Sequence, residues 1–244
     1  MKILAFETSC EHASIALHLD GRSVEHQLEG HTKHSEYILT AVSHLLGEAG
    51  LSVSALDAIA FGAGPGAFTG VRLACGVAQG LALSADIGVV PVPTLAALAH
   101  AASGETQHVY ALTDARMGEI YAAGYRVGGE EPVELAAAVC MSPEAFSLPG
   151  EMDWWLVGSA LKAWPMLAEN VSNQRIAGGI AGGVAGGVAG VDAEAVPRAS
   201  TVAELAAVHA ARGQILAPEQ ATPLYVRDKI ALTTAERLAR GGRA

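Results

Sequence analysis

The chain has 244 residues, of which 51% are hydrophobic and only 16% are charged. This length fits one large domain or two small ones, and it can bury enough surface to fold without a metal ion or a disulfide. The 25 acidic residues exceed the 15 Lys and Arg residues, so the formal net charge is −10. Because the chain has no basic cluster, it is not expected to bind nucleic acid by itself.

The first 104 residues predict three strands followed by alternating helices and strands. Apolar and alternating runs predict strands at 3–6, 14–19, 24–28, 58–61 and 89–92, with a hairpin turn at Asp20-Gly21. Helical spacing of apolar residues predicts helices at 37–49, 70–84 and 94–102, with Ser35, Thr69 and Thr94 as their N-caps. This order fits a hairpin sheet extended by right-handed crossovers, the ribonuclease-H-like layout of each lobe of the actin-like (ASKHA) α/β folds.

A smaller second lobe is expected over 105–228, after an N-terminal lobe at 1–104. Strands are predicted at 109–113, 119–125 and 156–157, the last leading into Gly158-Ser159-Ala160. Residues 177–191 form a glycine-rich four-residue repeat and predict a flexible loop, and 229–244 predict a flexible tail. A helix at 202–211 could belong to either lobe and could pack back onto the first.

The loop between the fourth strand and the second helix is rich in glycine, with Gly64, Pro65, Gly66 and Gly70. Such a loop can present backbone N–H groups to a phosphate. It is not a Walker A loop, because Val71 and Arg72 stand where Lys and Ser or Thr would be needed. Two interpretations remain, a tight structural turn and a contact site.

The residues of the helix at 70–84 are apolar or small on all sides, except for Arg72 and Gln79. Such a helix is expected to be packed against other elements on every side. Its glycines at an i, i+4 spacing would let another helix approach closely. We therefore predict a protein–protein interface formed by the first two helices; the alternative is burial by the chain's own second lobe. The predicted interface residues are Tyr37, Leu39, Ser43, Leu46, Thr69, Arg72, Leu73, Gly76 and Gly80.

No metal or nucleophile motif is convincing. His31 and His34 lack a third ligand at suitable spacing, and no Gly-x-Ser-x-Gly elbow occurs. The three cysteines, Cys10, Cys75 and Cys140, are scattered and predict buried thiols in a reducing compartment. With no signal-peptide core and no membrane span expected, the predicted location is the cytoplasm.

Several segments resemble the TsaB family, also called YeaZ. They are MKILAFETSCEHASIAL at the start, HSEYILTAVSHLL, the glycine loop and helix FGAGPGAFTGVRLACGVAQGLAL, TDARMGEIYAAGY, and PLYVR near the end. The resemblance is dense over 1–125 and sparse afterwards. It implies an actin-like two-lobed fold with ribonuclease-H-like lobes, the second of them degenerate.

The resemblance also implies a function. The family is the non-catalytic dimerisation subunit required for threonylcarbamoylation of the tRNA adenosine beside the anticodon. The chain would be a scaffold and activator of the catalytic subunit TsaD and a platform for the ATPase TsaE, and a homodimer when TsaD is absent. It would meet tRNA only through the complex. No cofactor of its own is implied, because ATP, metal and the threonylcarbamoyl-adenylate are expected on the partner subunits.

Positions that would bind metal or nucleotide in TsaD are altered here. The His-x-x-x-His metal pair falls on Thr94 and Leu98, and Thr is a poor ligand while Leu is none. The phosphate and adenosine loops correspond to three degenerate segments, formed by Glu7, Thr8 and Ser9, by Asp114 and Arg116, and by Gly158. Competent ATP turnover is therefore not expected. The alternatives are an actin-like sugar or acyl kinase and a metallopeptidase.

Overall fold

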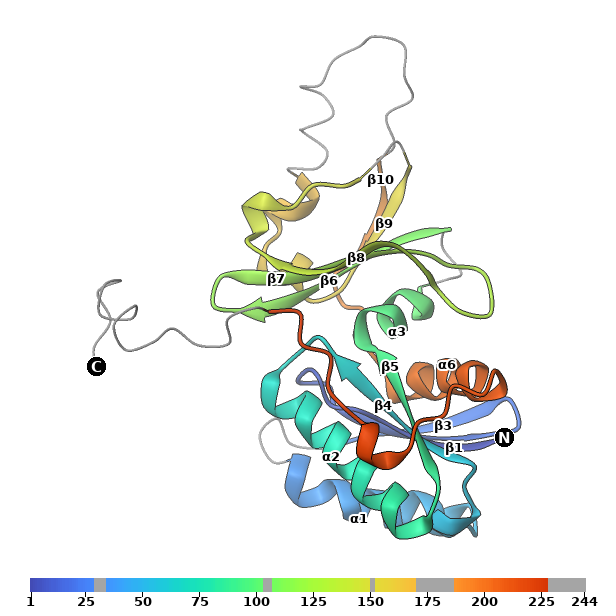
Figure 1. The fold of residues 1–244 in the computed structure, drawn as a ribbon. Coiled ribbons are helices and arrows are strands. Elements are labelled where there is room, and N and C mark those ends of the chain that lie inside the picture. The colour runs from blue at the N-terminus through green and yellow to red at the C-terminus, as the bar shows by residue number, and fades with distance from the viewer. Residues whose placement is uncertain (29–33, 103–106, 150–151, 170–186, 228–244) are drawn as a thin grey trace, which may run out of the picture.

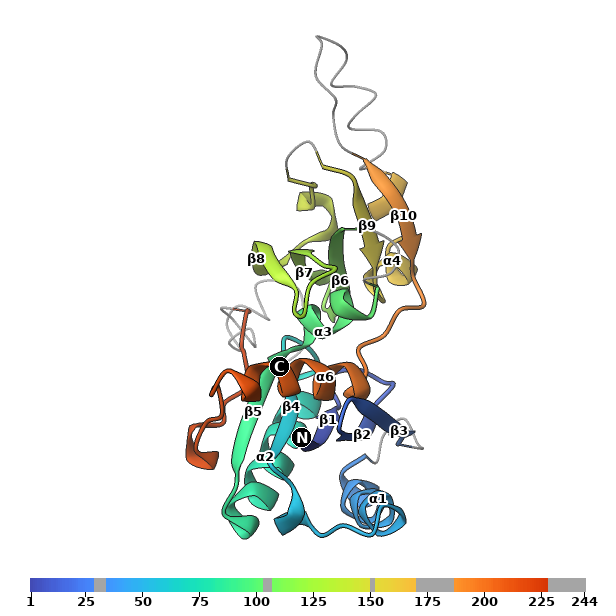
Figure 2. The same ribbon diagram turned by 90° about the vertical axis from the view of Figure 1, so that its right-hand side faces the viewer.

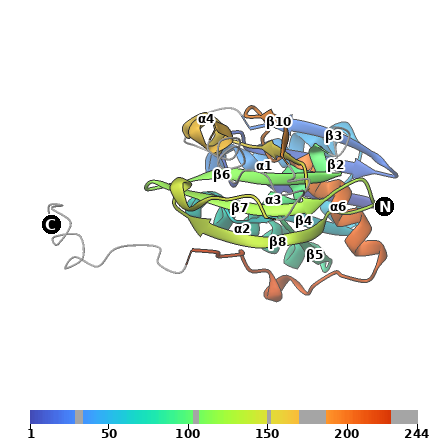
Figure 3. The same cartoon turned by 90° about the horizontal axis from the view of Figure 1, so that it is seen from above.

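The computed structural model describes residues 1–28, 34–102, 107–149, 152–169 and 187–227, which form two stacked lobes (Figure 1). Each lobe contains a five-stranded sheet, in the order β3-β2-β1-β4-β5 in the first and β10-β9-β6-β7-β8 in the second. Viewed from above, the strands of the second sheet lie over the first lobe (Figure 3). The tail at 229–244 and most of the glycine-rich repeat lie outside the described residues.

The first sheet forms as the sequence predicts. Its elements are β1 (Lys2–Glu7), β2 (Ser14–Leu19), β3 (Arg22–Gln27), α1 (His34–Glu48), β4 (Ala58–Gly64), α2 (Phe68–Ala85), β5 (Gly88–Pro93) and α3 (Thr94–Ala101). The first three strands pair antiparallel, whereas β4 and β5 extend the sheet in parallel. This confirms the ribonuclease-H-like layout of the first lobe.

Two helical layers cover this sheet. Leu4 and Phe6 of β1 pack against α1 and α2, while the alternate residues Ile3 and Ala5 pack against α6 (Ala199–Ala211). Side chains alternate between the faces of a strand, so one short apolar strand serves both layers. Figures 1 and 2 show α1 and α2 on the face turned away from the second lobe, with α3 and α6 between the sheets. The helix predicted at 202–211 thus packs on the first lobe.

The second lobe repeats the layout of the first. Its elements are β6 (His108–Arg116), β7 (Glu119–Arg126), β8 (Val133–Met141), β9 (Trp154–Val157), α4 (Ala160–Ala163) and β10 (Val188–Asp192). β6, β7 and β8 pair antiparallel, and β9 and β10 run parallel to β6. Strand order and directions therefore match those of β1–β5, whereas the described helix after β9 has only four residues.

Two strands contradict the sequence expectations. Residues 188–191, which belong to the glycine-rich repeat predicted as a loop, lie in β10 and pair with β9. The backbone at Gly190 lies directly against the Trp155 ring, and a Cβ at this position would overlap the ring. Glycine therefore allows this close approach of β10 to β9. β8 was not predicted, because its Glu and Ala residues are depleted in strands and its exposed edge position leaves no clean alternation.

Candidate functional site

The carboxyl end of β1 holds a fully buried acid. The Glu7 carboxylate accepts hydrogen bonds from the Ser9 N–H at 2.7 Å and from the Thr94 hydroxyl at 3.2 Å, and Thr94 Oγ1 in turn accepts from the Gly64 N–H at 3.1 Å. Burial raises the pKa of Glu7 because desolvation penalises the charged form. Thr94 therefore serves this network rather than capping α3, whose N-cap is Pro93.

This buried acid predicts a pH-dependent stability. Because the pKa of Glu7 is raised on folding, the free energy of unfolding falls as pH rises from below 4.5 through the folded-state pKa. Glu7→Gln keeps the acceptor for Ser9 and cannot ionise, so its melting temperature should exceed that of the wild type increasingly from pH 4.5 to pH 8. Thermal unfolding followed by circular dichroism measures this. The control Glu144→Gln, at an exposed carboxylate, should parallel the wild type; a parallel curve for Glu7→Gln would contradict the prediction.

The glycine loop packs against the chain's own backbone. A Cβ at Gly70 would overlap the carbonyl oxygen of Thr8, and one at Gly66 would lie 2.8 Å from that of Ser9. The Thr8 hydroxyl donates to the Gly70 carbonyl at 2.7 Å, and the Ala67 N–H donates to the Ser9 carbonyl at 2.7 Å. The close approach is to the segment after β1, which favours the structural-turn interpretation. α2 accordingly begins at Phe68 with Ala67 as N-cap, not at the predicted cap Thr69.

A cleft of about 990 Å³ lies between the lobes, and the loops predicted to be degenerate meet there. Thr8 and Ser9 line it from the first lobe, and Asp114 and Arg116 line it from the second. Gly158 does not line the cleft itself, but its neighbour Ser159 does. The φ of Gly158 is +114°, and a Cβ on Gly158 would overlap the Leu112 carbonyl oxygen. The glycine therefore permits close packing within the second lobe.

The Lys and Arg residues that line this cleft are all paired with carboxylates in the described part of the chain. The pairs are Arg116 with Glu11 and, at 3.2 Å, Asp114; Lys162 with Glu194 at 2.9 Å; Arg198 with Glu25 at 3.7 Å; and Arg227 with Glu119 at 2.7 Å. Arg116 of the second lobe pairs with Glu11 of the first, and both residues line the cleft. A polyphosphate entering here would compete with these carboxylates for every cation.

Cys10 lines the cleft, and Thr94 and Leu98 lie at positions for which the sequence predicts no metal binding. Burial raises the pKa of the Cys10 thiol to about 12, so it is protonated at neutral pH. The Thr94 hydroxyl donates to Glu7, and the Leu98 side chain is buried in the core.

The segment 223–227, which contains the PLYVR motif, connects the lobes. The Leu224 N–H donates to the Ala63 carbonyl at 2.7 Å, and the Tyr225 hydroxyl accepts from Arg72 Nε at 2.8 Å. Arg227 then donates to the Ala115 carbonyl at 2.9 Å in the second lobe. Figure 1 shows this red segment passing from the side of α2 to the second lobe, where Arg227 contacts the end of β6. The motif was noticed in the sequence, but this bridging role depends on contacts more than 100 residues apart.

A shallow apolar groove of about 390 Å³ runs between α1 and α2. We call it the helix-pair groove, and its lining residues are Leu39, Arg72, Leu73, Gly76, Val77, Gly80 and Leu81. It thus brings together five of the predicted interface residues and adds Val77 and Leu81, which continue the same helical stripe. No atom lies within 4 Å of a Cβ placed at Gly76 or Gly80, so both glycines face open space.

Four predicted interface residues lie elsewhere. Leu46 is only 4% exposed and packs in the core of the first lobe, so its assignment to an interface was wrong. Tyr37 and Ser43 are exposed but do not line the groove, and Thr69 lines the interlobe cleft instead. The sequence pattern could not separate these positions, because it does not fix which part of an amphipathic helix meets the sheet.

The exposed side of α2 is not covered by the second lobe. Its buried stripe of Val71, Ala74, Cys75, Ala78 and Ala82 packs on the first sheet, and Leu83 on the other side is 51% exposed. Among the described residues, α2 is the helix that is long and apolar enough by length and composition to cross a membrane. Its core contacts hold one stripe against the sheet, and the groove side of the helix stays exposed.

Comparisons with known proteins agree with this architecture. The family model described as TsaD, tRNA N6-adenosine threonylcarbamoyltransferase, matches residues 28–235. The tRNA threonylcarbamoyladenosine biosynthesis protein TsaB of Escherichia coli K12 is 35% identical over 240 residues, covering 95% of this chain and 96% of that protein. TsaB of Haemophilus influenzae is 42% identical over 123 residues, which cover 50% of this chain and 52% of that protein.

Solved structures of YeaZ proteins also resemble this chain. The structure of YeaZ from Pseudomonas aeruginosa matches with a TM-score of 0.78 and 36% identity, covering 92% of this chain and 99% of that chain. A second structure, described as an uncharacterized protein with similarity to peptidase YeaZ from the same organism, gives the same TM-score over 93% of this chain and 99% of that chain. The chain therefore belongs to the TsaB/YeaZ family of tRNA threonylcarbamoyladenosine biosynthesis proteins.

Proposed function

We propose that this protein is a non-catalytic subunit required for threonylcarbamoylation of the tRNA adenosine beside the anticodon. It acts in the cytoplasm as a scaffold and activator of TsaD, which docks on the helix-pair groove, and TsaE joins the assembly. ATP, metal and the threonylcarbamoyl-adenylate belong to the partner subunits, and tRNA meets this chain only in the complex. When TsaD is absent, a homodimer uses the same groove.

The observation that carries this proposal is the uncovered helix-pair groove. Leu39, Leu73, Val77 and Leu81 give it apolar sides, and Gly76 and Gly80 form an open notch on α2. Helices pack with axes about 8–10 Å apart, and small residues at the contact favour the close end of that range. The groove therefore suits an apolar helix of a protein partner better than a charged ligand.

Size-exclusion chromatography with light scattering tests the assembly. The protein is run alone and mixed with TsaD, and a mass equal to one copy of each subunit is the expected result for the mixture. The protein alone is expected to run as a dimer that TsaD converts into the mixed complex. If both proteins elute at their separate masses at micromolar concentration, the scaffold proposal is overturned.

The interlobe cleft leaves an actin-like sugar or acyl kinase as the second candidate. Its volume of about 990 Å³ would admit a nucleotide, but its cations are already paired, and Glu11, Asp114 and Glu194 would repel phosphate. We therefore predict that isothermal calorimetry of the lone protein with ATP and Mg²⁺ detects no binding below about 1 mM, which corresponds to about −4 kcal/mol. Micromolar binding, with transfer of the γ-phosphoryl group to an added sugar or carboxylic acid and formation of ADP, would instead support the kinase.

A further inference from the structure

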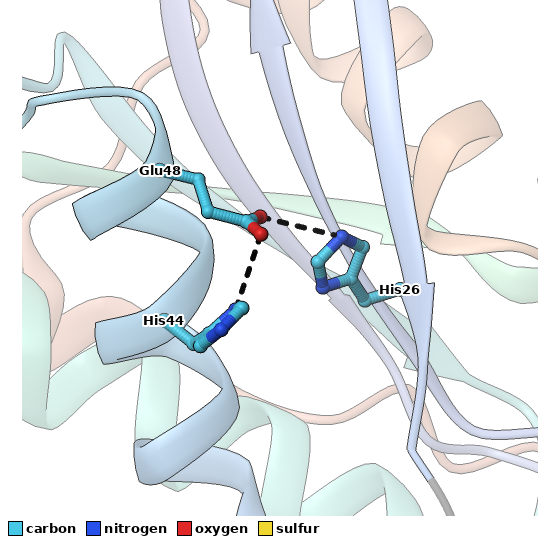
Figure 4. Close-up of side chains that lie close together, drawn as sticks. All are labelled: His26, His44 and Glu48. Atoms are coloured by element: carbon cyan, nitrogen blue, oxygen red, sulfur yellow. Dashed lines mark ion pairs between the residues drawn. The ribbon is translucent and has the colours of Figure 1, made fainter.

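Three metal-ligating side chains lie close together at the edge of the first sheet, and none of them lines the groove or the cleft. His26 lies on the edge strand β3, and His44 and Glu48 lie one turn apart on α1 (Figure 4). His26 Nε2 is 3.6 Å and His44 Nδ1 is 3.5 Å from the Glu48 carboxylate, and one ligand atom from each residue lies within 4.8 Å of the others.

These separations fit a shared ion better than direct hydrogen bonds. An N–H···O hydrogen bond spans about 2.7–3.2 Å, which is shorter than either histidine–carboxylate distance. Ligands on a tetrahedral Zn²⁺, with bonds of about 2.0–2.2 Å, lie about 3.4 Å from one another. Both His–Glu separations are close to this spacing, with His26 facing Oε2 and His44 facing Oε1 of the Glu48 carboxylate. Binding one ion requires the two rings to approach each other, and the His44 side chain is 68% exposed.

We propose that His26, His44 and Glu48 bind a divalent transition-metal ion, with Zn²⁺ as the best match. Two imidazoles and one carboxylate form a known three-ligand set for zinc, with a fourth position left for water. An i, i+4 pair on a helix supplies two ligands on one face, and a third from a strand fixes the helix to the sheet. The ion would tie α1 to β3, an edge strand that pairs on one side only.

The test uses the full chain, stripped of metal with EDTA and dialysed, and titrated with ZnCl₂ in a calorimeter. One equivalent of Zn²⁺ should bind and should raise the melting temperature, and EDTA should reverse the rise. His44→Gln and Glu48→Gln change exposed side chains and should fold normally. Each should weaken binding by at least about tenfold, because even the outer partners of metal ligands contribute about 10–100-fold.

His12→Gln is the matched control, because His12 is an exposed histidine outside the cluster. It should bind Zn²⁺ as the wild type does. Co²⁺ provides a second readout, since its visible absorption reports four-coordination by this ligand set and should disappear in His44→Gln. The proposal is overturned if the wild type binds no Zn²⁺. It is equally overturned if His44→Gln and Glu48→Gln bind as the wild type does, because the ion would then sit on other groups such as the free thiols.

Discussion

Replacing Gly76 or Gly80 by Leu should weaken co-elution with TsaD while leaving the protein folded. Both glycines line the helix-pair groove, and a Cβ at either position meets no atom of the chain within 4 Å. A leucine therefore fills the space that a partner helix would occupy. Overpacking of a close contact typically costs about 1–3 kcal/mol, which corresponds to about a 5–150-fold loss of affinity for each substitution, and more for the pair.

The isolated variants should be at least as stable as the wild type, because Leu is a good helix former whereas Gly is about 0.8–1 kcal/mol less favourable than Ala in a helix. Thermal unfolding checks this, and light scattering with TsaD checks assembly. Ala211→Leu is the control, since it adds bulk at an exposed position of α6, on the opposite side of the first sheet. Undiminished assembly of the Gly76→Leu, Gly80→Leu double variant would refute the groove as the docking site.

Replacing Gly70 by Ala should destabilise the fold strongly. Gly70 lies in the first turn of α2, where an added Cβ would overlap the Thr8 carbonyl oxygen, and the same turn accepts the hydroxyl hydrogen bond of Thr8. The obstacle is backbone rather than a flexible side chain, so relief requires α2 to move away from β1. A loss of about 2–3 kcal/mol in the free energy of unfolding is expected, by analogy with overpacked cores.

Gly76→Ala is the matched control, because it makes the same chemical change on the same helix in open space. It should raise the free energy of unfolding by up to about 1 kcal/mol, the helix-propensity difference between Ala and Gly. Urea unfolding followed by circular dichroism measures both variants. Equal stability of Gly70→Ala and Gly76→Ala would show that the loop is not held by this close approach.

Much of the first lobe and of the groove could be predicted from the sequence. The strands at 3–6, 58–61 and 89–92 are short apolar runs, and such runs are typical of strands that are buried on both faces. The lack of polar residues along α2, with glycines at 76 and 80, indicated a helix that needs a partner. These signals are local, because they depend on the spacing of residues within one element.

Other features of the site depend on distant segments and could not be predicted. Leu46 points into the core because α1 meets the sheet at an angle that only packing decides, and β8 forms because β7 offers it an edge. The pairing of Arg116 with Glu11 joins residues of different lobes. Cys10 acquires its raised pKa from burial beside Glu7. The Arg116 and Glu11 partners are 105 residues apart in the sequence.

By itself, the sequence determined the family, the order of elements in the first lobe and an apolar helix that needs a cover, because motifs and periodicity are properties of neighbouring residues. Only the tertiary structure decided that α6 returns to the first sheet, that the cleft's cations meet carboxylates, and that His26 meets His44 and Glu48. The physical reason is that burial, ion pairing and metal coordination depend on distances in space. Those distances are set by how the two sheets and their helices pack.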